Sequence, residues 1–154
     1  MKNEIIAKEF YDMAIEYCNL VKTTKITEDL IEDLIVRIMK LYIAGISLPK
    51  VRPDNNVFKE EYPHIRVNVD SKFDRYYELF SPYEKDSFVG ASINDDLEGI
   101  YDDLCKGIVQ YEAGYIKNAI FEWRETHSFH WGNHATSVLR ALHQVRADNW
   151  YKRD

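Results

Sequence analysis

Residues 92–108 read "SINDDLEGIYDDLCKGI" and decide how the chain folds. Apolar side chains recur there at steps of three and four, the spacing that gives a helix one continuous apolar face. Ser92 is a favourable N-cap, and Asp95 three residues later resembles a capping box with Asp in place of Glu. The segment therefore predicts an amphipathic helix that buries one face and exposes most of its acidic residues.

Four other segments show the same period and predict further amphipathic helices. Thr27 is a favourable N-cap for the second of them, and Gly45 is a favourable terminator. A shorter helix is predicted over residues 71–80, where aromatic side chains fall on neighbouring faces before Pro82 stops it. The four longer segments span about residues 3–23, 28–44, 114–127 and 129–150.

The stretch of residues 45–70 holds three of the four prolines and shows no helical period. Only Ile65, Val67 and Val69 alternate, which predicts one short extended segment. Residues 82–93 are also predicted to be extended. A connection as long as 45–70 in a compact domain is either a functional loop or a mobile one.

Every long element is thus predicted to be helical, and most links are short. These features favour an all-α, up-and-down bundle of about five main helices, one short helix and a long Pro-containing loop. A chain of 154 residues fits a single domain, here residues 1–154. A domain of this size buries enough surface to fold without a disulfide or a metal.

The net charge of -6, from 26 acidic and 20 basic side chains, repels nucleic acid and anionic membranes. The longest basic cluster, "YKRD" at residues 151–154, is more typical of a solvated chain end than of nucleic-acid binding. No apolar run is long enough to span a bilayer, and no signal peptide is recognisable. Cys18 and Cys105 lie in apolar helical stripes without metal spacing, which favours reduced thiols. We therefore expect a cytoplasmic protein with no nucleic-acid or membrane partner.

Residues 129–143, "FHWGNHATSVLRALH", hold three of the five histidines. His130 and His134 stand four apart, the spacing at which one helical face can hold a metal ion. A zinc site needs three or four ligands, and the H-E-x-x-H signature needs a glutamate where this chain has Trp131. We therefore expect no metal and no cofactor, with His130 and His134 as the only candidate metal ligands.

A polar cluster is predicted between the acidic helix and the last helix. Asp96 and Asp103 lie at the border of the apolar stripe of their helix, and Arg140 and His143 stand one turn apart on the last helix. These four residues are expected to form an ion pair that joins the two helices. Such a cluster is either a bridge that fixes helix register, the interpretation we favour, or an acid-base or cation site.

The aromatic residues suggest a second candidate surface. Tyr76, Tyr77 and Tyr83 stand near the long proline loop, and tyrosine is enriched in binding sites because its large ring carries a polar tip. The alternative is that these rings belong to the core.

The order of these segments resembles a bacterial domain-of-unknown-function family, numbered 5063. Its members share a Ser-Ile-x-x-Asp-Leu-x-x-Ile-Tyr-x-Asp-Leu helix and end in a Trp-Gly followed by an Ala-Leu-Arg-Ala-Leu-His segment. Val138 stands where the family often has Ala, and residues 45–70 are not matched. The resemblance implies an all-helical cytoplasmic bacterial protein and no established activity. The matching positions are Ser92, Ile93, Asp96, Leu97, Ile100, Tyr101, Asp103, Leu104, Trp131, Gly132, Leu139, Arg140, Ala141, Leu142 and His143.

Two hypotheses for function follow from the sequence. The first is a small acidic helical module that binds a partner protein, as adaptor or immunity-type proteins do, or forms a homodimer. The second is an enzyme or a protein that binds a metal or small ligand. Its pocket would hold Asp96, Asp103, Arg140 and His143, with His130 or His134 beside them.

Overall fold

The computed structural model of the chain describes residues 1–54 and 61–150. Part of the proline loop, residues 55–60, and the basic "YKRD" at 151–154 lie outside the described residues. The described elements are the helices α1 (Lys2–Thr23), α2 (Ile31–Ser47), α3 (Ile93–Glu112), α4 (Ile116–Phe129) and α5 (Trp131–Trp150), the 3-10 turn η1 (Glu28–Leu30), and the strands β1 (Arg75–Leu79) and β2 (Phe88–Ser92).

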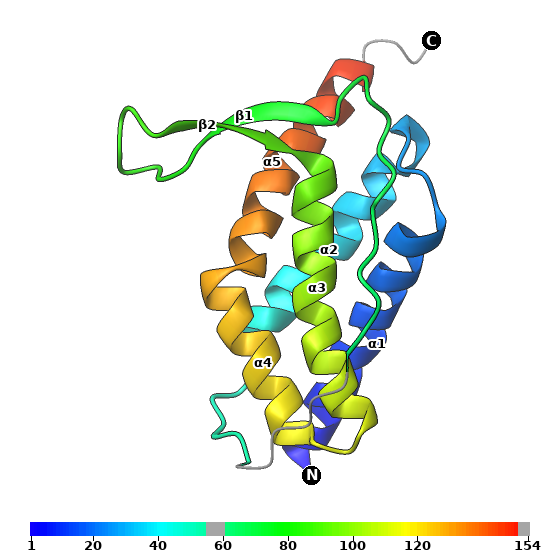
Figure 1. Cartoon of the computed structure of the whole chain (residues 1–154), viewed down its shortest axis with the longest axis vertical. Helices are drawn as coiled ribbons and strands as arrows, with labels where there is room; N and C mark the ends of the chain where they lie inside the picture. The colour runs from blue at the N-terminus through cyan, green and yellow to red at the C-terminus, as the bar shows by residue number, and fades with distance from the viewer. Residues whose placement is uncertain (55–60, 151–154) are drawn as a thin grey trace.

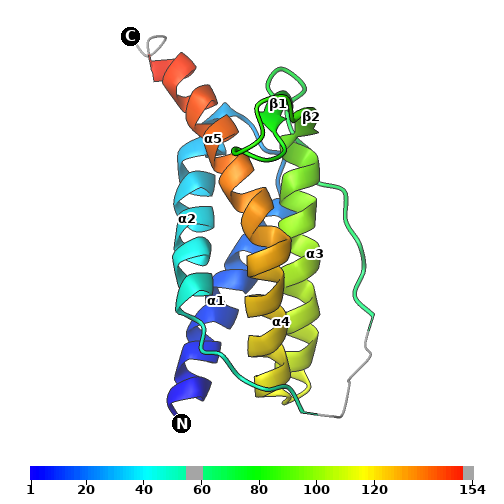
Figure 2. The ribbon, with the colours of Figure 1, turned by 90° about the vertical axis from the view of Figure 1, so that its left-hand side faces the viewer.

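The five helices form the bundle predicted from the sequence, which confirms the all-α fold class (Figure 1). Helix α3 packs against α1, α4 and α5, and α2 packs against α1 and α5. Helices α4 and α5 follow one another up the same side of the bundle and run opposite to α3 (Figure 1). The described parts of the connection after α2 pass under one end of the bundle and return beside α3 (Figure 2).

The centre of the core is a cluster of three fully buried aromatic rings. The ring centroid of Phe10 lies 4.7 Å from that of Trp123 and 6.2 Å from that of Trp131. Both indoles also find a hydrogen-bond acceptor, as buried N–H groups require. Trp123 Nε1 donates to the Leu104 carbonyl and Trp131 Nε1 donates to the Trp123 carbonyl, each at 2.9 Å. These contacts fix α4 and α5 against α1 and α3.

The predicted N-cap of α3 is confirmed, because the Ser92 hydroxyl accepts a hydrogen bond from the Asp95 amide at 3.1 Å. Thr27 makes no such bond, and α2 is instead preceded by the 3-10 turn η1. The extended segment predicted before residue 70 contributes one isolated parallel bridge between Ile26 and Val69. This bridge holds the long connection against the turn between α1 and α2.

The prediction of a short helix over residues 71–80 is wrong, because this segment contains strand β1. β1 pairs antiparallel with β2 from Arg75 opposite Ser92 to Leu79 opposite Phe88. Aromatic residues favour strands when a pairing partner is present, and side chains then alternate between two faces. Burial alternates in this way along β1, so its period is two rather than 3.6.

Two further expectations concern the cysteines and the membrane. Cys18 and Cys105 are buried and free, as predicted. In the described part of the chain, no helix has the length and apolar character needed to cross a bilayer.

We expect Gly107→Ala to destabilise the fold. A Cβ atom at Gly107 would lie 2.0 Å from Trp123 Nε1, in the fully buried centre of the bundle. The cost of overpacking, about 1–3 kcal/mol, should exceed the gain in helix propensity of about 1 kcal/mol. Chemical denaturation measures the free energy of unfolding. Gly90→Ala is the control, because nothing lies within 4 Å of its Cβ position, and equal effects of the two substitutions would contradict this packing.

Candidate functional site

A surface groove of about 650 Å³ opens between the hairpin and the junction of α4 with α5. Its apolar lining comes from Leu79 of β1, from the link that follows β1 and from the last residue of α4, and β1 also contributes the carboxylate of Glu78. Two imidazoles from the junction of α4 with α5 also line the groove. The lining residues used below are Glu78, Leu79, Phe80, Phe129, His130 and His134.

The junction between α4 and α5 places both histidines on this groove. His130 is the C-cap of α4, with φ of -140°, and α5 begins at the next residue. The His130 carbonyl accepts a hydrogen bond from the His134 amide at 3.2 Å, so the two residues stand one helical turn apart on one face. Gly132 permits this tight junction, because a Cβ there would lie 2.0 Å from the His127 carbonyl oxygen.

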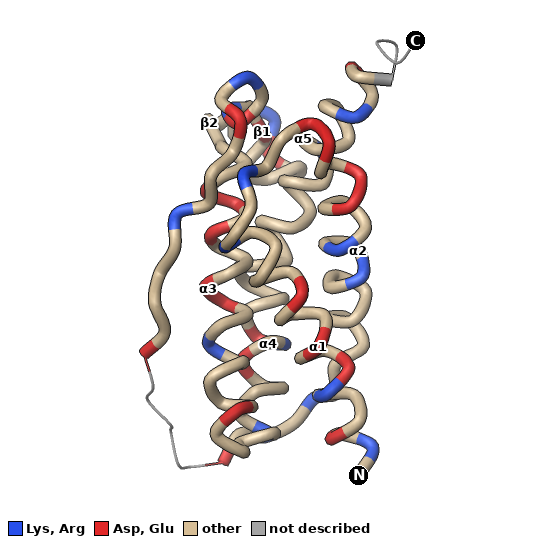
Figure 3. The backbone as a smooth tube through the Cα atoms, turned by 90° about the vertical axis from the view of Figure 1, so that its right-hand side faces the viewer, with Lys and Arg blue, Asp and Glu red and all other residues tan. Residues whose placement is uncertain are grey.

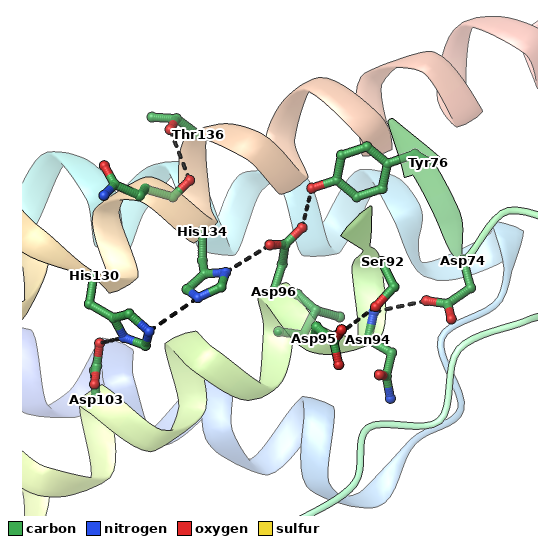
Figure 4. Close-up of polar contacts among 12 residues, drawn as sticks. Asp74, Tyr76, Ser92, Asn94, Asp95, Asp96, Asp103, His130, His134 and Thr136 are labelled. Carbon is green, nitrogen blue, oxygen red and sulfur yellow. Dashed lines mark hydrogen bonds and ion pairs between the residues drawn. The ribbon is translucent and has the colours of Figure 1, made fainter. Parts of the chain in front are cut away.

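Each imidazole is held from behind by a carboxylate of α3 (Figure 4). His134 Nδ1 lies 2.8 Å from Asp96 Oδ1, and His130 Nδ1 lies 2.5 Å from Asp103 Oδ2. The pairing follows from direction: α5 runs opposite to α3, so the later histidine meets the earlier aspartate. The Asp96 and Asp103 side chains are only 5% and 1% exposed, whereas that of His130 is 54% exposed.

A glycine of α3 makes room for the second of these rings. Gly99 lies between Asp96 and Asp103 in sequence and on the same face of the helix. A Cβ at Gly99 would lie 2.7 Å from Cδ2 of His134. The sequence signal for the site is therefore an aspartate, a glycine and an aspartate at steps of three and four, facing two histidines four apart.

The hairpin adds a third element to the site. The Asn94 amide donates to Asp74 Oδ1 and the Ile93 amide donates to the Asp74 carbonyl, both at 2.8 Å, which fixes the start of β1 on α3. Tyr76 follows two residues later, and its hydroxyl donates to Asp96 Oδ2 (Figure 4). Glu78 has the same strand parity as Tyr76 and lines the groove.

The free nitrogens of the two rings face each other, with His130 Nε2 and His134 Nε2 3.3 Å apart. Because Nδ1 of each ring points at a carboxylate, each Nδ1 is assigned a proton, and each Nε2 then carries the lone pair of the neutral ring. With this assignment the two lone pairs repel each other, and a proton or another cation between them would remove the repulsion. The Asp96 carboxylate accordingly raises the pKa of His134, and burial raises the pKa of Asp96 itself.

The structure does not bring Arg140 and His143 to the predicted cluster. Both side chains are exposed, and Arg140 Nη1 donates to Gln144 Oε1 at 3.3 Å. The reason is register: since Asp96 pairs with His134, positions further along α5 lie beyond the start of α3. Asp96 and Asp103 therefore pair with His134 and His130 instead, which the sequence had singled out only for their spacing.

The three tyrosines of the second predicted surface are also separated. Tyr76 reaches the carboxylate of Asp96, whereas Tyr77 and Tyr83 are exposed.

Asp103 has a second partner besides His130, because Lys106 Nζ lies 3.3 Å from Asp103 Oδ1.

Comparison with known proteins bears on the fold. A family model described as a domain of unknown function (DUF5063) matches residues 2–148. A crystal structure of protein BF1032 from Bacteroides fragilis is similar with a TM-score of 0.70 and 22% sequence identity, over 94% of this chain and 95% of that one. No curated protein matches the chain. At this identity the structural likeness shows the fold alone.

We expect His134 and His127 to titrate on opposite sides of pH 6.5, the ordinary pKa of histidine. The Asp96 carboxylate raises the pKa of His134, whereas burial lowers that of His127. Imidazole chemical shifts measured by NMR across the pH range report both values. Asp96→Asn should bring the pKa of His134 down and leave that of His127 unchanged.

The same shift has a consequence for stability. A raised pKa means that the contribution of His134 is fully present below pH 6.5 and is lost as the pH rises through the folded-state pKa. A His134 that titrates below 6.5 would contradict the assigned pairing.

Proposed function

This chain belongs to the DUF5063 family, and because that family has no assigned function, we propose one from the site alone: the protein binds a divalent transition-metal ion between His130 and His134. The observation that carries this proposal is the 3.3 Å between their Nε2 atoms. Two imidazole nitrogens bound to one tetrahedral zinc ion lie about 3.3 Å apart, given zinc-nitrogen bonds of about 2.0–2.1 Å.

The carboxylates behind the rings support the same proposal. Metal-binding histidines usually donate their second N–H group to a carboxylate, which fixes the ring and increases its basicity. Asp96 and Asp103 stand in this position at 2.8 and 2.5 Å from the two Nδ1 atoms. Both carboxylates are buried, whereas the two rings line the open groove, so the Nε2 side of the rings is the side that an incoming ion can approach from the groove.

The local charge favours a cation over an anion. Asp96 and Asp103 contact the imidazoles, Glu78 lines the same groove, and the cation Lys106 pairs with Asp103. A bound anion would meet these carboxylates, whereas a divalent ion would be attracted by them and would accept the lone pairs of both Nε2 atoms.

Two imidazoles fill half of a tetrahedral coordination shell. Among the described residues, no group of three or more His, Cys, Asp or Glu side chains is already arranged to hold a metal ion. Glu78 is the carboxylate on the groove wall that we assign as third ligand, since it faces the groove from β1. The fourth position then remains open to water or to a small ligand, as in catalytic zinc sites.

Calorimetric titration with Zn²⁺ tests the proposal on the purified chain. We expect one ion per chain, and a loss of affinity of about tenfold or more in His130→Ala and in His134→Ala, because each substitution removes a ligand. Asp103→Asn should weaken binding by roughly 10–100-fold through the orientation of His130. His143→Ala is the matched control, since His143 is an exposed histidine of the same helix.

Two further measurements separate loss of the site from loss of the fold. Circular dichroism should show that the variants keep their helices, and the absorption spectrum of bound Co²⁺ reports tetrahedral geometry. Absence of stoichiometric Zn²⁺ binding, or binding unaffected by either histidine substitution, would refute the site. Unchanged affinity in Glu78→Gln would remove Glu78 as a ligand and leave the histidine pair in place.

A second candidate function, binding of a partner protein in the cytoplasm as adaptor or immunity-type modules do, is favoured by exposed aromatic rings. Their side chains are between 70% and 97% exposed, far more than expected for core residues, and such patches mark interaction surfaces. The hairpin loop carries Glu84 and Asp86 with one lysine, Lys85, between them, and this net negative charge suits a partner with basic residues around an apolar patch. The exposed rings are Tyr77, Phe80, Tyr83, Phe88 and Phe129.

A photo-crosslinking amino acid at position 83 tests this second candidate in the native cells. We expect one discrete crosslinked band, lost when Phe80 and Phe88 are both changed to Ser, because the apolar contact is removed. The same crosslinker at Lys117, an exposed position on α4, is the control and should give no such band. A band that survives the double substitution would contradict binding through the hairpin.

A further inference from the structure

Helices α1 and α3 pack against each other in opposite directions and bring the two cysteines of the chain together (Figure 1). Their register is visible at Tyr11, whose ring stacks on that of Tyr111 with centroids 4.3 Å apart and whose hydroxyl donates to Glu112 Oε1 at 2.8 Å. Cys18 follows Tyr11 by seven residues, and Cys105 precedes Glu112 by seven. Seven residues are about two helical turns, so both cysteines lie on the contact face, opposite each other.

The two thiol groups are in direct contact. The Cys18 thiol donates a hydrogen bond to the sulfur of Cys105, which raises the pKa of Cys18 and lowers that of Cys105. Burial opposes the second effect, and the Tyr101 hydroxyl supports it by a hydrogen bond to the same sulfur. Asp102, one of the acidic residues that predominate along α3 (Figure 3), also opposes it without reversing the shift. Cys105 is therefore the thiol that more readily becomes a nucleophilic thiolate.

Both cysteines lie at the edge of the core rather than at its centre. Cys18 and Cys105 are 6% and 7% exposed, whereas their neighbours Tyr17 and Leu104 are completely buried. This residual exposure admits a molecule as small as hydrogen peroxide and keeps out bulky reagents.

We propose that Cys18 and Cys105 are a redox modification site, which hydrogen peroxide oxidises to a reversible disulfide between α1 and α3. Two thiols already in contact need only a short approach to reach the S–S bond length of about 2.05 Å. Disulfides of this transient kind occur in reducing compartments as redox sensors.

The chemistry balances with one peroxide molecule per chain. The Cys105 thiolate attacks one peroxide oxygen, the O–O bond breaks, and the leaving hydroxide takes up a proton to become water. The sulfur of Cys18 then attacks the sulfenic acid on Cys105, the S–O bond breaks, and the second oxygen leaves as water with the proton of Cys18. The two thiols lose two electrons, which the peroxide gains. A dithiol reductant reverses the modification by thiol–disulfide exchange.

The cysteine pair is separate from the histidine groove. Asp103 precedes Cys105 by two residues, which places it on the opposite side of α3, where it contacts His130. Oxidation needs no metal ion, so the proposal goes beyond the metal site and does not depend on it. A chelator in every sample keeps the two tests independent.

Mass spectrometry of the whole chain tests the proposal. The reduced protein is treated with a small excess of hydrogen peroxide, denatured and alkylated. We expect the untreated chain to carry two alkyl groups, one on each cysteine, and the treated chain to carry none at the mass of a single chain. A dithiol should restore both alkylation sites. Two alkyl groups after treatment, oxidation to sulfinic acid without a disulfide, or a disulfide between two chains overturns the proposal.

The thermal stability of the oxidised chain tests whether the bond joins native partners. The disulfide closes a long loop that contains α2 and the hairpin, so we expect the melting temperature to rise by roughly 10 °C. Cys18→Ser treated in the same way is the control and should show no such rise. An unchanged melting temperature in the oxidised native chain would mean that the bond forms only after opening, which overturns the pairing.

Substitutions test the order of attack. In Cys18→Ser, Cys105 should accumulate as a sulfenic acid that dimedone traps. In Cys105→Ser, Cys18 should react at least about tenfold more slowly, because its thiol stays protonated. Tyr101→Phe should slow oxidation of the native pair severalfold, and Tyr111→Phe, the same change further along α3, is the matched control. Faster trapping of Cys18 than of Cys105 would overturn the assignment of the attacking thiol, and equal rates in the two tyrosine variants would overturn the role of Tyr101. Circular dichroism checks that each variant keeps its helices.

Discussion

The close approach of α3 to the α4 and α5 side of the bundle is the contact on which the rest of the structure depends. Two glycines of α3 permit it, because each leaves space for a ring from the opposite helices. Gly107 accommodates the indole of Trp123, and Gly99 accommodates the imidazole of His134. A larger residue at either position would push the helices apart, separate the aromatic core and break the contacts between aspartates and histidines. Packing and the polar site therefore share one cause.

Burying the two aspartates of the polar site is energetically unfavourable if they only connect two helices. Burial of a carboxylate is unfavourable unless it is paired and hydrogen-bonded, and apolar residues of similar volume often stabilise a helix interface as well or better. Asp96 and Asp103 are almost completely buried, yet their partners turn their second nitrogens towards an open groove. This combination of a closed back and an open front is the geometry on which the proposed metal site rests.

Sequence periodicity predicts the five helices because each buries one face, and the period of 3.6 residues is visible in the sequence of each. Periodicity does not predict the hairpin. Aromatic residues in 71–80 fit a helix as well as a strand, and the choice depends on pairing with residues 88–92, a contact that is not local. Local propensity decides little where a partner segment is available.

In the site, too, the individual residues can be predicted from nearby sequence, but their pairing cannot. Asp96 and Asp103 were recognisable at the border of an apolar stripe, and His130 and His134 by their spacing. Which acid meets which base depends on where α5 starts relative to α3. That relation is set by the break at His130 and by Gly132, neither of which carries a periodic signal. For this reason the sequence predicts Arg140 and His143 beside Asp96 and Asp103, whereas the structure places them further along α5.

The junction at His130 also determines where the chain tolerates changes in length. Between Trp123, which is anchored at Gly107, and His134, which is anchored at Gly99, one inserted residue would turn the later ring by about 100° around the helix axis. An insertion in α3 between Gly99 and Gly107 would turn one glycine away from the ring that it accommodates in the same way. Among the described residues, no glycine contact of this kind holds the hairpin loop to another helix, so a change in length is expected to be tolerated better there than in the helical segment that carries the two imidazoles.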